Sequence, residues 1–389
     1  MSSKPAESAP GKRAPGKRAP GEAASGRRAP GKRPGDSAPH VSPGSAERPH
    51  RPPKDRAKGL TIAVTGPTGA IGRSVIRALE ADDRVDRILG MARRPFEPAA
   101  LGWRKTEYRQ GDVVDRDAVA KFVADADVVV HLAFAIVGGR EESRKINLGG
   151  TRNVFEATVA ADRPRRLVYT SSLAAYGYYA ENPVPLTEDI PARGSPEHYY
   201  SAQKAECEAL LAELTAGHDI EVYVLRPCIV VGPDSTLVIS NLRFEPAMEW
   251  LPRPARKLLG WVPGLRPVLP DPGVPIQFVH EADVGAAVFA AAVGAGPPGA
   301  YNLAGDGEVS MTDVARAMGE YAVPIPHLLV GVAARLVSAF PWLPPEAEWV
   351  HAARHPMLMD TTRARCNLGW APQYTTRQAL DSMARAATG

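Results

Sequence analysis

The first apolar run of the chain, residues 60–65, leads directly into the turn Gly66-Pro67-Thr68-Gly69-Ala70-Ile71-Gly72. Gly66 permits a tight turn out of a strand, Gly69 removes a Cβ that would block a phosphate, and Gly72 lets a following helix pack closely. The N-terminus of that helix offers N–H groups and the positive end of its dipole to an anion. A glycine string alone also fits ordinary tight packing. Its place between a predicted strand and a predicted helix favours a dinucleotide pyrophosphate site.

Apolar runs and helical stretches alternate after this turn. Strands are expected at 60–65, 87–91, 127–133, 166–171 and 220–227, and helices at 70–80, 115–124, 143–161 and 198–216. The strand runs are continuously apolar, as in a parallel sheet that is covered on both faces. Repeated strand–helix units predict an α/β fold, with a Rossmann-type doubly wound parallel sheet and a smaller C-terminal substrate lobe. The expected core spans 59–233, and the lobe spans 234–389 with core elements returning at about 275–304.

Residues 1–58 differ in composition from the rest of the chain. They hold 14 Lys and Arg against 5 Asp and Glu, a balance of +9, so the remainder carries −5 of the total of +4. The unit Ala-Pro-Gly-Lys-Arg recurs and large apolar residues are nearly absent, which predicts disorder. A polycation can touch nucleic acid or acidic lipid, but a solvated extension without a specific partner is favoured. The segment has no apolar stretch of a secretory signal.

Several classes of protein are disfavoured by composition. The three cysteines, Cys207, Cys228 and Cys366, are odd in number and lack C-x-x-C spacing, so neither a disulfide framework nor a metal site is indicated. A reducing cytoplasm is the expected location. No window reaches the roughly 18 apolar residues of a membrane span. The nearest, 328–343, is interrupted by Arg335 and is interpreted as a packed helix.

A tyrosine and a lysine four residues apart form a second candidate site, Tyr200-Ser201-Ala202-Gln203-Lys204. On a helix, residues at this spacing share a face, so the phenol and the ammonium can point at one ligand. A nearby cation lowers the pKa of a phenol, which suits Tyr200 as a proton donor or acceptor near neutral pH. The spacing is also common on surface helices, so the pair alone does not define a site.

A third candidate is Ser172, which follows the predicted strand 166–171. Ligands of open α/β sheets bind beyond the carboxyl ends of the strands, where a serine can hydrogen-bond a substrate oxygen. The alternative is a serine that caps a turn.

The three sites in this order are far more specific than any one of them. With them, residues 60–389 resemble the short-chain dehydrogenase/reductase superfamily, in its extended branch of epimerases, dehydratases and reductases related to UDP-glucose 4-epimerase. Further matching stretches are Gly111-Asp112-Val113, His131-Leu132-Ala133, Asn147-Leu148-Gly149-Gly150-Thr151, Leu225-Arg226-Pro227, Phe278-Val279-His280-Glu281-Ala282-Asp283-Val284 and Leu368-Gly369-Trp370.

The resemblance implies roles for individual residues. Ser172 and Tyr200 take the places of the catalytic serine and the acid/base, and Lys204 binds the nicotinamide ribose and tunes Tyr200. Asp112 contacts the adenine. The cofactor-binding residues expected in full are Gly66, Thr68, Gly69, Ala70, Ile71, Gly72, Arg93, Asp112, Val113, Leu132, Ala133, Asn147, Lys204 and Pro227.

The end of the second strand bears on the choice between NAD and NADP. NAD enzymes usually place an acid here for the ribose 2′-OH, but Ala92 stands at that position. Arg93 and Arg94 can instead bind a 2′-phosphate. NADP is therefore slightly favoured, and the alternative is NAD bound through Asp112 and the backbone beside two solvated arginines.

The residues after Ser172 narrow the reaction. Related sugar-nucleotide dehydratases carry Thr-Asp-Glu, whereas this chain has Ser172-Leu173-Ala174, whose apolar side chains cannot shuttle protons. Dehydration is disfavoured, which leaves epimerisation or carbonyl/alcohol redox chemistry on a nucleotide-sugar-like or other small substrate. A non-catalytic dinucleotide sensor or scaffold is the alternative, and Tyr200 with Lys204 speaks against it. Assembly as a homodimer is left open, and no specific nucleic-acid partner is expected.

Overall fold

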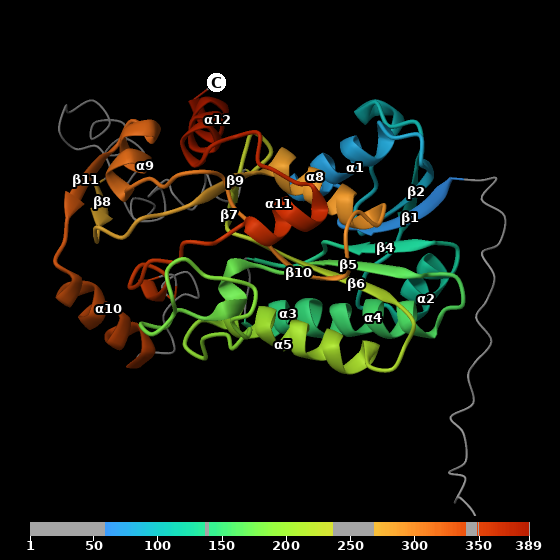
Figure 1. The fold of residues 1–389 in the computed structure, drawn as a ribbon, viewed down its shortest axis with the longest axis horizontal. Coiled ribbons are helices and arrows are strands. Elements are labelled where there is room, and N and C mark those ends of the chain that lie inside the picture. The colour runs from blue at the N-terminus through green and yellow to red at the C-terminus, as the bar shows by residue number, and fades with distance from the viewer. Residues whose placement is uncertain (1–58, 137–139, 236–267, 340–347, 349, 389) are drawn as a thin grey trace, which may run out of the picture. The chain divides into compact units, whose positions relative to one another are not determined.

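The computed structural model describes residues 59–136, 140–235, 268–339, 348 and 350–388. The segment 1–58, predicted to be disordered, lies outside the described residues, as do residues 236–267 of the predicted substrate lobe. Within the described part, strands and helices alternate from residue 60 onward, as the sequence predicts (Figure 1).

A seven-stranded sheet forms the centre of the fold. Its order is β10-β6-β5-β4-β1-β2-β3, and every pair is parallel. The chain steps in one direction from β1 to β3 and then returns to β4 on the other side of β1. The predicted Rossmann-type sheet is thus confirmed, with its topological switch between β1 and β4. The strands are β1 (Leu60–Thr65), β2 (Val85–Ala92), β3 (Thr106–Gln110), β4 (Val128–His131), β5 (Arg166–Thr170), β6 (Glu221–Pro227) and β10 (Gly299–Leu303).

Helices cover both faces of this sheet (Figure 1). On one face lie α1 (Ala70–Glu80), α8 (Glu281–Ala292) and α11 (Thr362–Leu368). On the other lie α2 (Arg116–Ala124), α3 (Arg140–Arg144), the π-helical stretch η2 (Lys145–Gly150), α4 (Thr151–Ala160) and α5 (Tyr199–Thr215). The predicted helix 143–161 corresponds to α3, η2 and α4 in succession. Short 3₁₀ turns, η1 (Ala99–Leu101) and η3 (Leu173–Tyr176), follow β2 and β5.

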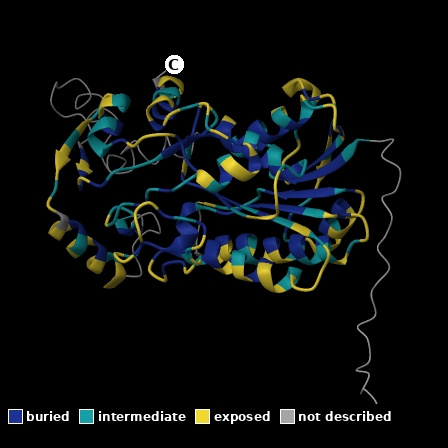
Figure 2. Ribbon diagram, viewed as in Figure 1, coloured by how far each residue is buried: buried dark blue, intermediate teal, exposed yellow. Residues whose placement is uncertain are grey.

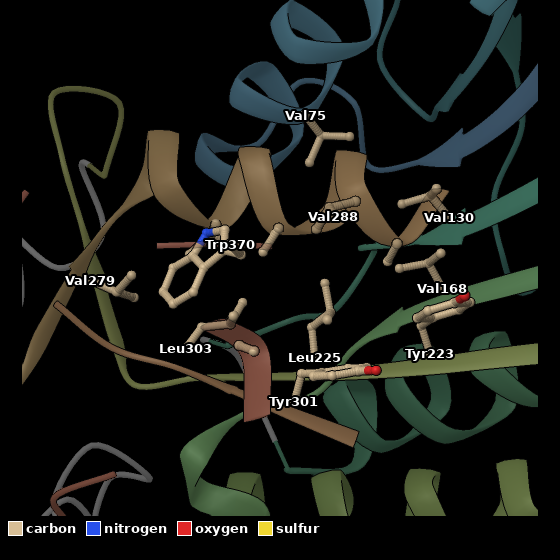
Figure 3. Close-up of a cluster of buried hydrophobic side chains, with 14 of the residues drawn as sticks. Val75, Val130, Val168, Tyr223, Leu225, Val279, Val288, Tyr301, Leu303 and Trp370 are labelled. Atoms are coloured by element: carbon tan, nitrogen blue, oxygen red, sulfur yellow. The ribbon is translucent and has the colours of Figure 1, made fainter. Parts of the chain in front are cut away.

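The sheet buries side chains on both faces, so two apolar clusters form. Ile62 and Val64 of β1 belong to the cluster under α1 and α8, while Ala63 between them belongs to the cluster under α2, α4 and α5. Figure 2 shows the strands and the inner helix faces buried, and Figure 3 shows part of the first cluster, including Trp370 and Tyr301. A fully buried aliphatic side chain contributes about 1.5–3 kcal/mol to the stability of the fold. Because the strands are apolar on both faces, the fold gains this contribution on each face that helices cover.

The C-terminal part of the described chain adds smaller elements. Two further parallel pairs join β7 (Ile229–Val231) to β9 (Phe278–His280) and β8 (Val268–Asp271) to β11 (Tyr321–Pro324). Helices α9 (Met311–Met318), α10 (His327–Ala339) and α12 (Thr376–Thr388) accompany them. The predicted helix near 328–343 is α10, which buries Val330 and Ala334 but leaves Leu328 77% exposed. Within the described ranges, none of the helices has the length and apolar character needed to cross a membrane.

Candidate active site and cofactor-binding turn

The glycine turn lies between β1 and α1, at the switch point of the sheet. Gly66 has a φ of +74°, and a Cβ there would lie 3.2 Å from the Ala133 backbone. A Cβ on Gly72 would lie 2.1 Å from the carbonyl oxygen of Gly66, so the turn itself requires the third glycine. At Gly69 a Cβ would meet nothing nearer than 3.7 Å, and this residue is exposed. The space in front of Gly69 is therefore open, which fits a phosphate group.

The start of α1 also fits an anion. Gly69 is its N-cap, no described side chain caps this end, and the first turn contains no acidic residue. The N–H groups and dipole of a helix N-terminus attract phosphate oxygens. Thr68, Ala70 and Ile71, which sequence reasoning placed in the cofactor site, lie in this turn or at the start of the helix.

The ends of β2 and β3 bring together the residues expected near the adenosine. The Gly111 N–H donates to the Ala92 carbonyl oxygen at 3.2 Å. Arg93 and Arg94 are exposed and form no ion pair with any described residue. Asp112 is half-buried, and its Oδ1 accepts the backbone N–H two residues further on at 3.1 Å. Arg93, Arg94 and Asp112, which are the candidate determinants of the choice between NAD and NADP, thus lie at the ends of two adjacent strands.

A threonine and a histidine join the ends of β1 and β4. The Thr65 hydroxyl lies 2.8 Å from Nδ1 of His131 and accepts the N–H groups of Leu132 and Ala133, each at 3.2 Å. Burial, assisted by the charge of Lys204, lowers the pKa of His131 to about 3, so its ring is neutral at physiological pH. These hydrogen bonds position Leu132 and Ala133, the two residues expected to line the cofactor. The sequence alone predicted no separate role for His131.

Asn147 and Pro227 are both buried, and Asn147 is bonded to this loop. The Asn147 amide accepts the Ala135 N–H at 2.7 Å and donates to the Ala135 carbonyl at 2.9 Å and to Gln203 Oε1 at 2.8 Å. These bonds tie the loop after β4 to α5. Pro227 ends β6, and Val113 is buried in the second cluster. Direct contacts of these three residues with a cofactor stay predictions.

Ser172 and Tyr200 lie on segments that pack together, because the Ser201 hydroxyl next to Tyr200 donates to the carbonyl oxygen of Ala174 in η3 at 2.6 Å. Ser172 is the N-cap of η3, and its Oγ accepts the Ala174 N–H at 3.2 Å. Tyr200 lies in the first turn of α5. Burial raises the pKa of the Tyr200 phenol, and a side-chain hydrogen bond with Ser172 partly offsets that rise. The folded chain therefore brings together the segments that carry the expected serine and tyrosine.

Lys204 lies near Tyr200 and is bonded to the end of β5. Its Nζ donates to the Thr170 carbonyl at 2.9 Å, lies 3.6 Å from the Phe134 ring centre and 5.9 Å from that of Tyr200. Burial lowers the pKa of Lys204 to about 8. The sequence predicts that Lys204 lowers the pKa of Tyr200, and the structure differs. Burial raises that pKa, and the partner that lowers it is Ser172.

One chain of contacts joins the glycine turn to these side chains. Gly66 packs against the Ala133 backbone. The next residue, Phe134, meets Tyr200 edge to face at 5.5 Å between ring centres and also covers Lys204. The three sequence-predicted sites thus converge at the carboxyl ends of β1, β4 and β5. This is the crevice in which open α/β sheets bind ligands.

Tyr199, the neighbour of Tyr200, is engaged elsewhere. Its hydroxyl donates to the Ile136 carbonyl oxygen at 2.5 Å. That bond fixes the loop after β4 against α5. Tyr199 is therefore a structural anchor in this arrangement.

A buried ion pair beside the site was not found by sequence reasoning. Glu208, one turn beyond Lys204 on α5, accepts the Ser171 hydroxyl at 2.5 Å and pairs with Arg226 through Nε and Nη2 at 3.0 and 2.6 Å. Burial lowers the Arg226 pKa, but the Glu208 carboxylate and the Tyr176 phenol together raise it more, so the net shift is upward. The spacing of Tyr200, Lys204 and Glu208 by four residues is the signal that could have revealed it.

Other features of the described residues lie away from this site. A cavity of about 430 Å³ on the outer surface of α3, η2, α4 and α5 is lined by residues such as Arg144, Lys145 and Arg152, and by none of the predicted site residues. In the part of the chain that the structure describes, no cluster of His, Cys, Asp and Glu could hold a metal ion. Cys207, Cys228 and Cys366 are free thiols.

Comparisons with known proteins agree with this fold. The sequence model of the NAD dependent epimerase/dehydratase family matches residues 62–304. An uncharacterized protein of Mycobacterium tuberculosis is 26% identical over 332 residues, which cover 83% of each chain. L-arabinose 1-dehydrogenase (NAD(P)(+)) of Haloferax volcanii is 34% identical over 176 residues, 42% of this chain and 65% of that enzyme. A short-chain dehydrogenase/reductase superfamily protein of Agrobacterium tumefaciens, solved with bound NAD, has a TM-score of 0.62 and 20% identity, covering 84% of this chain and 97% of that one.

Proposed function

The chain belongs to the NAD dependent epimerase/dehydratase family, and on this basis we propose that it is an NAD(P)-dependent oxidoreductase or epimerase in which Tyr200 is the acid/base. The observation that carries the proposal is the packing of the first turn of α5, which holds Tyr200, on η3, which Ser172 caps, at the strand ends beside the glycine turn. A phenol next to a serine hydroxyl can exchange a proton with a substrate oxygen that lies against both.

Each side chain has a separate task in this proposal. Tyr200 gives a proton to a carbonyl oxygen or takes one from a hydroxyl. Ser172 holds that oxygen by a hydrogen bond. Lys204 supplies a cation beside the loop that lines the cofactor, and its lowered pKa follows from burial. The dinucleotide supplies hydride transfer when bound, held by Gly66, Gly69, Gly72 and the start of α1.

Dehydration is the reaction that the site favours least. Leu173 and Ala174 follow Ser172 in η3, and both are buried, with exposed fractions of 9% and 3%. Neither carries a group that can move a proton. We therefore retain epimerisation and simple carbonyl/alcohol redox chemistry, on a sugar-like or other small alcohol or ketone.

The choice between NAD and NADP is a separate part of the proposal. Exposed Arg93 and Arg94 follow β2 where a 2′-phosphate would be read, which supports NADP. NAD is the cofactor in the solved Agrobacterium neighbour. Arg93→Asp should weaken NADP binding by about 1.5–3 kcal/mol, the scale of a charge-assisted hydrogen bond, and should spare NAD. Equal changes in both dissociation constants would exclude Arg93 as the discriminating residue.

Tyr200→Phe tests the proposed acid/base directly. The variant keeps the ring that packs on Phe134 and removes only the hydroxyl. With a substrate found by screening sugars, nucleotide sugars, sterols and aldehydes with both cofactors, kcat should fall by about 10²–10⁴-fold. Cofactor affinity should stay nearly unchanged. Tyr223→Phe is the matched control, because it also loses one hydroxyl, which donates to the Gly296 carbonyl oxygen at the amino end of β6, away from the site. Full activity in the Tyr200 variant would refute the mechanism.

A further inference from the structure

The first turn of α5, which carries Tyr200, is anchored by several partners. The Ser201 hydroxyl donates to the Ala174 carbonyl at 2.6 Å and accepts the Ser195 N–H at 2.9 Å. The N-cap His198 accepts the Ser201 N–H through Nδ1 at 3.2 Å. These contacts come from within or next to the Rossmann core and hold the C-terminal side of Tyr200.

The N-terminal side of Tyr200 is held by a residue from far along the chain. Glu348 Oε2 accepts the backbone N–H of Tyr199 at 2.7 Å, across 149 positions of sequence. Glu348 is only 2% exposed and Tyr199 only 9%. Tyr199 in turn donates through its hydroxyl to Ile136, in the loop that also carries Phe134. The contact thus links the C-terminal part of the chain to α5 and to the cofactor loop.

The chemistry of this contact favours a firm connection. A carboxylate that accepts the first N–H of a helix makes a charge-assisted hydrogen bond and complements the helix dipole. Two imidazoles lie close by. Burial lowers the pKa of His198 to about 4, and the nearby His351 lowers it further. Burial also lowers the pKa of His351, although Glu197 and Glu348 oppose that change. Both rings are therefore neutral near pH 7 and do not compete as cations for the carboxylate.

We infer that Glu348 is a positioning residue, which fixes the first turn of α5 so that the Tyr200 hydroxyl stays against Ser172. Tyr200 lies between two residues that are both anchored, Tyr199 by Glu348 and Ser201 by η3. Release of the Glu348 anchor removes the hydrogen bond that holds the first N–H of α5. The inference rests on the proposed function of Tyr200 and adds a residue that acts through the helix.

Three substitutions separate hydrogen bonding from packing. Glu348→Gln keeps an acceptor oxygen at nearly the same size, Glu348→Leu removes the acceptor, and Glu348→Asp withdraws the carboxylate by one methylene. The matched control is Asp313→Leu. Asp313 also accepts a backbone N–H at a helix start, from Ser310 at 3.0 Å, but it belongs to α9, away from Tyr200. Its loss should lower the melting temperature and leave kcat unchanged.

The measurements are kcat, KM, the cofactor dissociation constant and hydrogen exchange of the α5 first turn. In Glu348→Leu, kcat should fall about 10–100-fold, which is the scale expected for a misplaced catalytic group. The dissociation constant of the cofactor should change by less than about twofold. Amides of the first turn should exchange faster. Glu348→Gln should recover most of kcat, and Glu348→Asp should lie between Gln and Leu.

Several outcomes overturn the inference. One is an unchanged kcat in Glu348→Leu, and another is a Gln variant as impaired as Leu. If Glu348→Leu does not fold, a wild-type kcat in Glu348→Asp overturns it equally. Tyr200→Phe in the same assay separates the two proposals. If that variant stays active, the proposed function fails, while hydrogen exchange still reports whether Glu348 holds the turn.

Discussion

Breaking the buried ion pair between Glu208 and Arg226 should cost far more stability than breaking an exposed pair of the same geometry. The two side chains are 9% and 7% exposed, and two hydrogen bonds join them. In Glu208→Leu, Arg226 keeps its charge in the same buried place without a carboxylate. Removal of one partner from a buried pair costs about 3–5 kcal/mol of the free energy of unfolding. Ser171 also loses its acceptor, so the upper part of that range is expected.

A double variant tests the cause of this loss. In Glu208→Leu with Arg226→Met, both charges are gone and the volume is largely kept. Replacement of a whole buried pair by apolar side chains is often neutral or stabilising. The double variant should therefore be more stable than Glu208→Leu alone, although it carries one more substitution.

The assay is guanidinium denaturation followed by far-UV circular dichroism. The slope of the free energy of unfolding against denaturant concentration should be the same in all variants. The control is Glu107→Leu. Glu107 pairs with Arg87 through the same two guanidinium atoms, at 2.5 and 2.7 Å, but these side chains are 46% and 36% exposed. An exposed pair contributes about 0–1 kcal/mol. If Glu208→Leu costs no more than Glu107→Leu, the argument from burial is wrong.

Two further predictions concern the cofactor turn and Lys204. Gly69→Ala should weaken cofactor binding without lowering the melting temperature, because its Cβ meets no atom nearer than 3.7 Å. Gly72→Ala should lower both the cofactor affinity and the melting temperature, because its Cβ would lie 2.1 Å from the Gly66 oxygen. Equal melting temperatures of the two variants by calorimetry would contradict this. The pKa of Lys204 is lowered from 10.5 to about 8, so between these values the unfolded chain binds the extra proton and the free energy of unfolding should rise with pH. Denaturation of Lys204→Met at pH 8 and about pH 10 checks this, and the variant should lack that part of the rise.

Local rules explain why much of the fold was predictable. The strand 60–65 is specified by its own apolar run, and the turn after it is specified by glycines that permit a tight bend and a close approach of the helix. The strand β3 was missed because its sequence, Thr106–Gln110, is largely polar at the edge of the sheet. Edge strands are covered on fewer sides, so their sequences carry a weaker apolar signal.

The sequence by itself determined that Tyr200 and Lys204 share a helix face, that Ser172 follows a strand, and that a glycine turn opens the first helix. Only the tertiary structure decided how these groups interact. Burial, which raises the pKa of Tyr200 and lowers that of Lys204, depends on segments such as the Phe134 loop. The Glu348 contact joins residues 149 positions apart. Helix periodicity and turn chemistry act over a few residues, whereas desolvation and long-range hydrogen bonds exist only once distant segments have packed together.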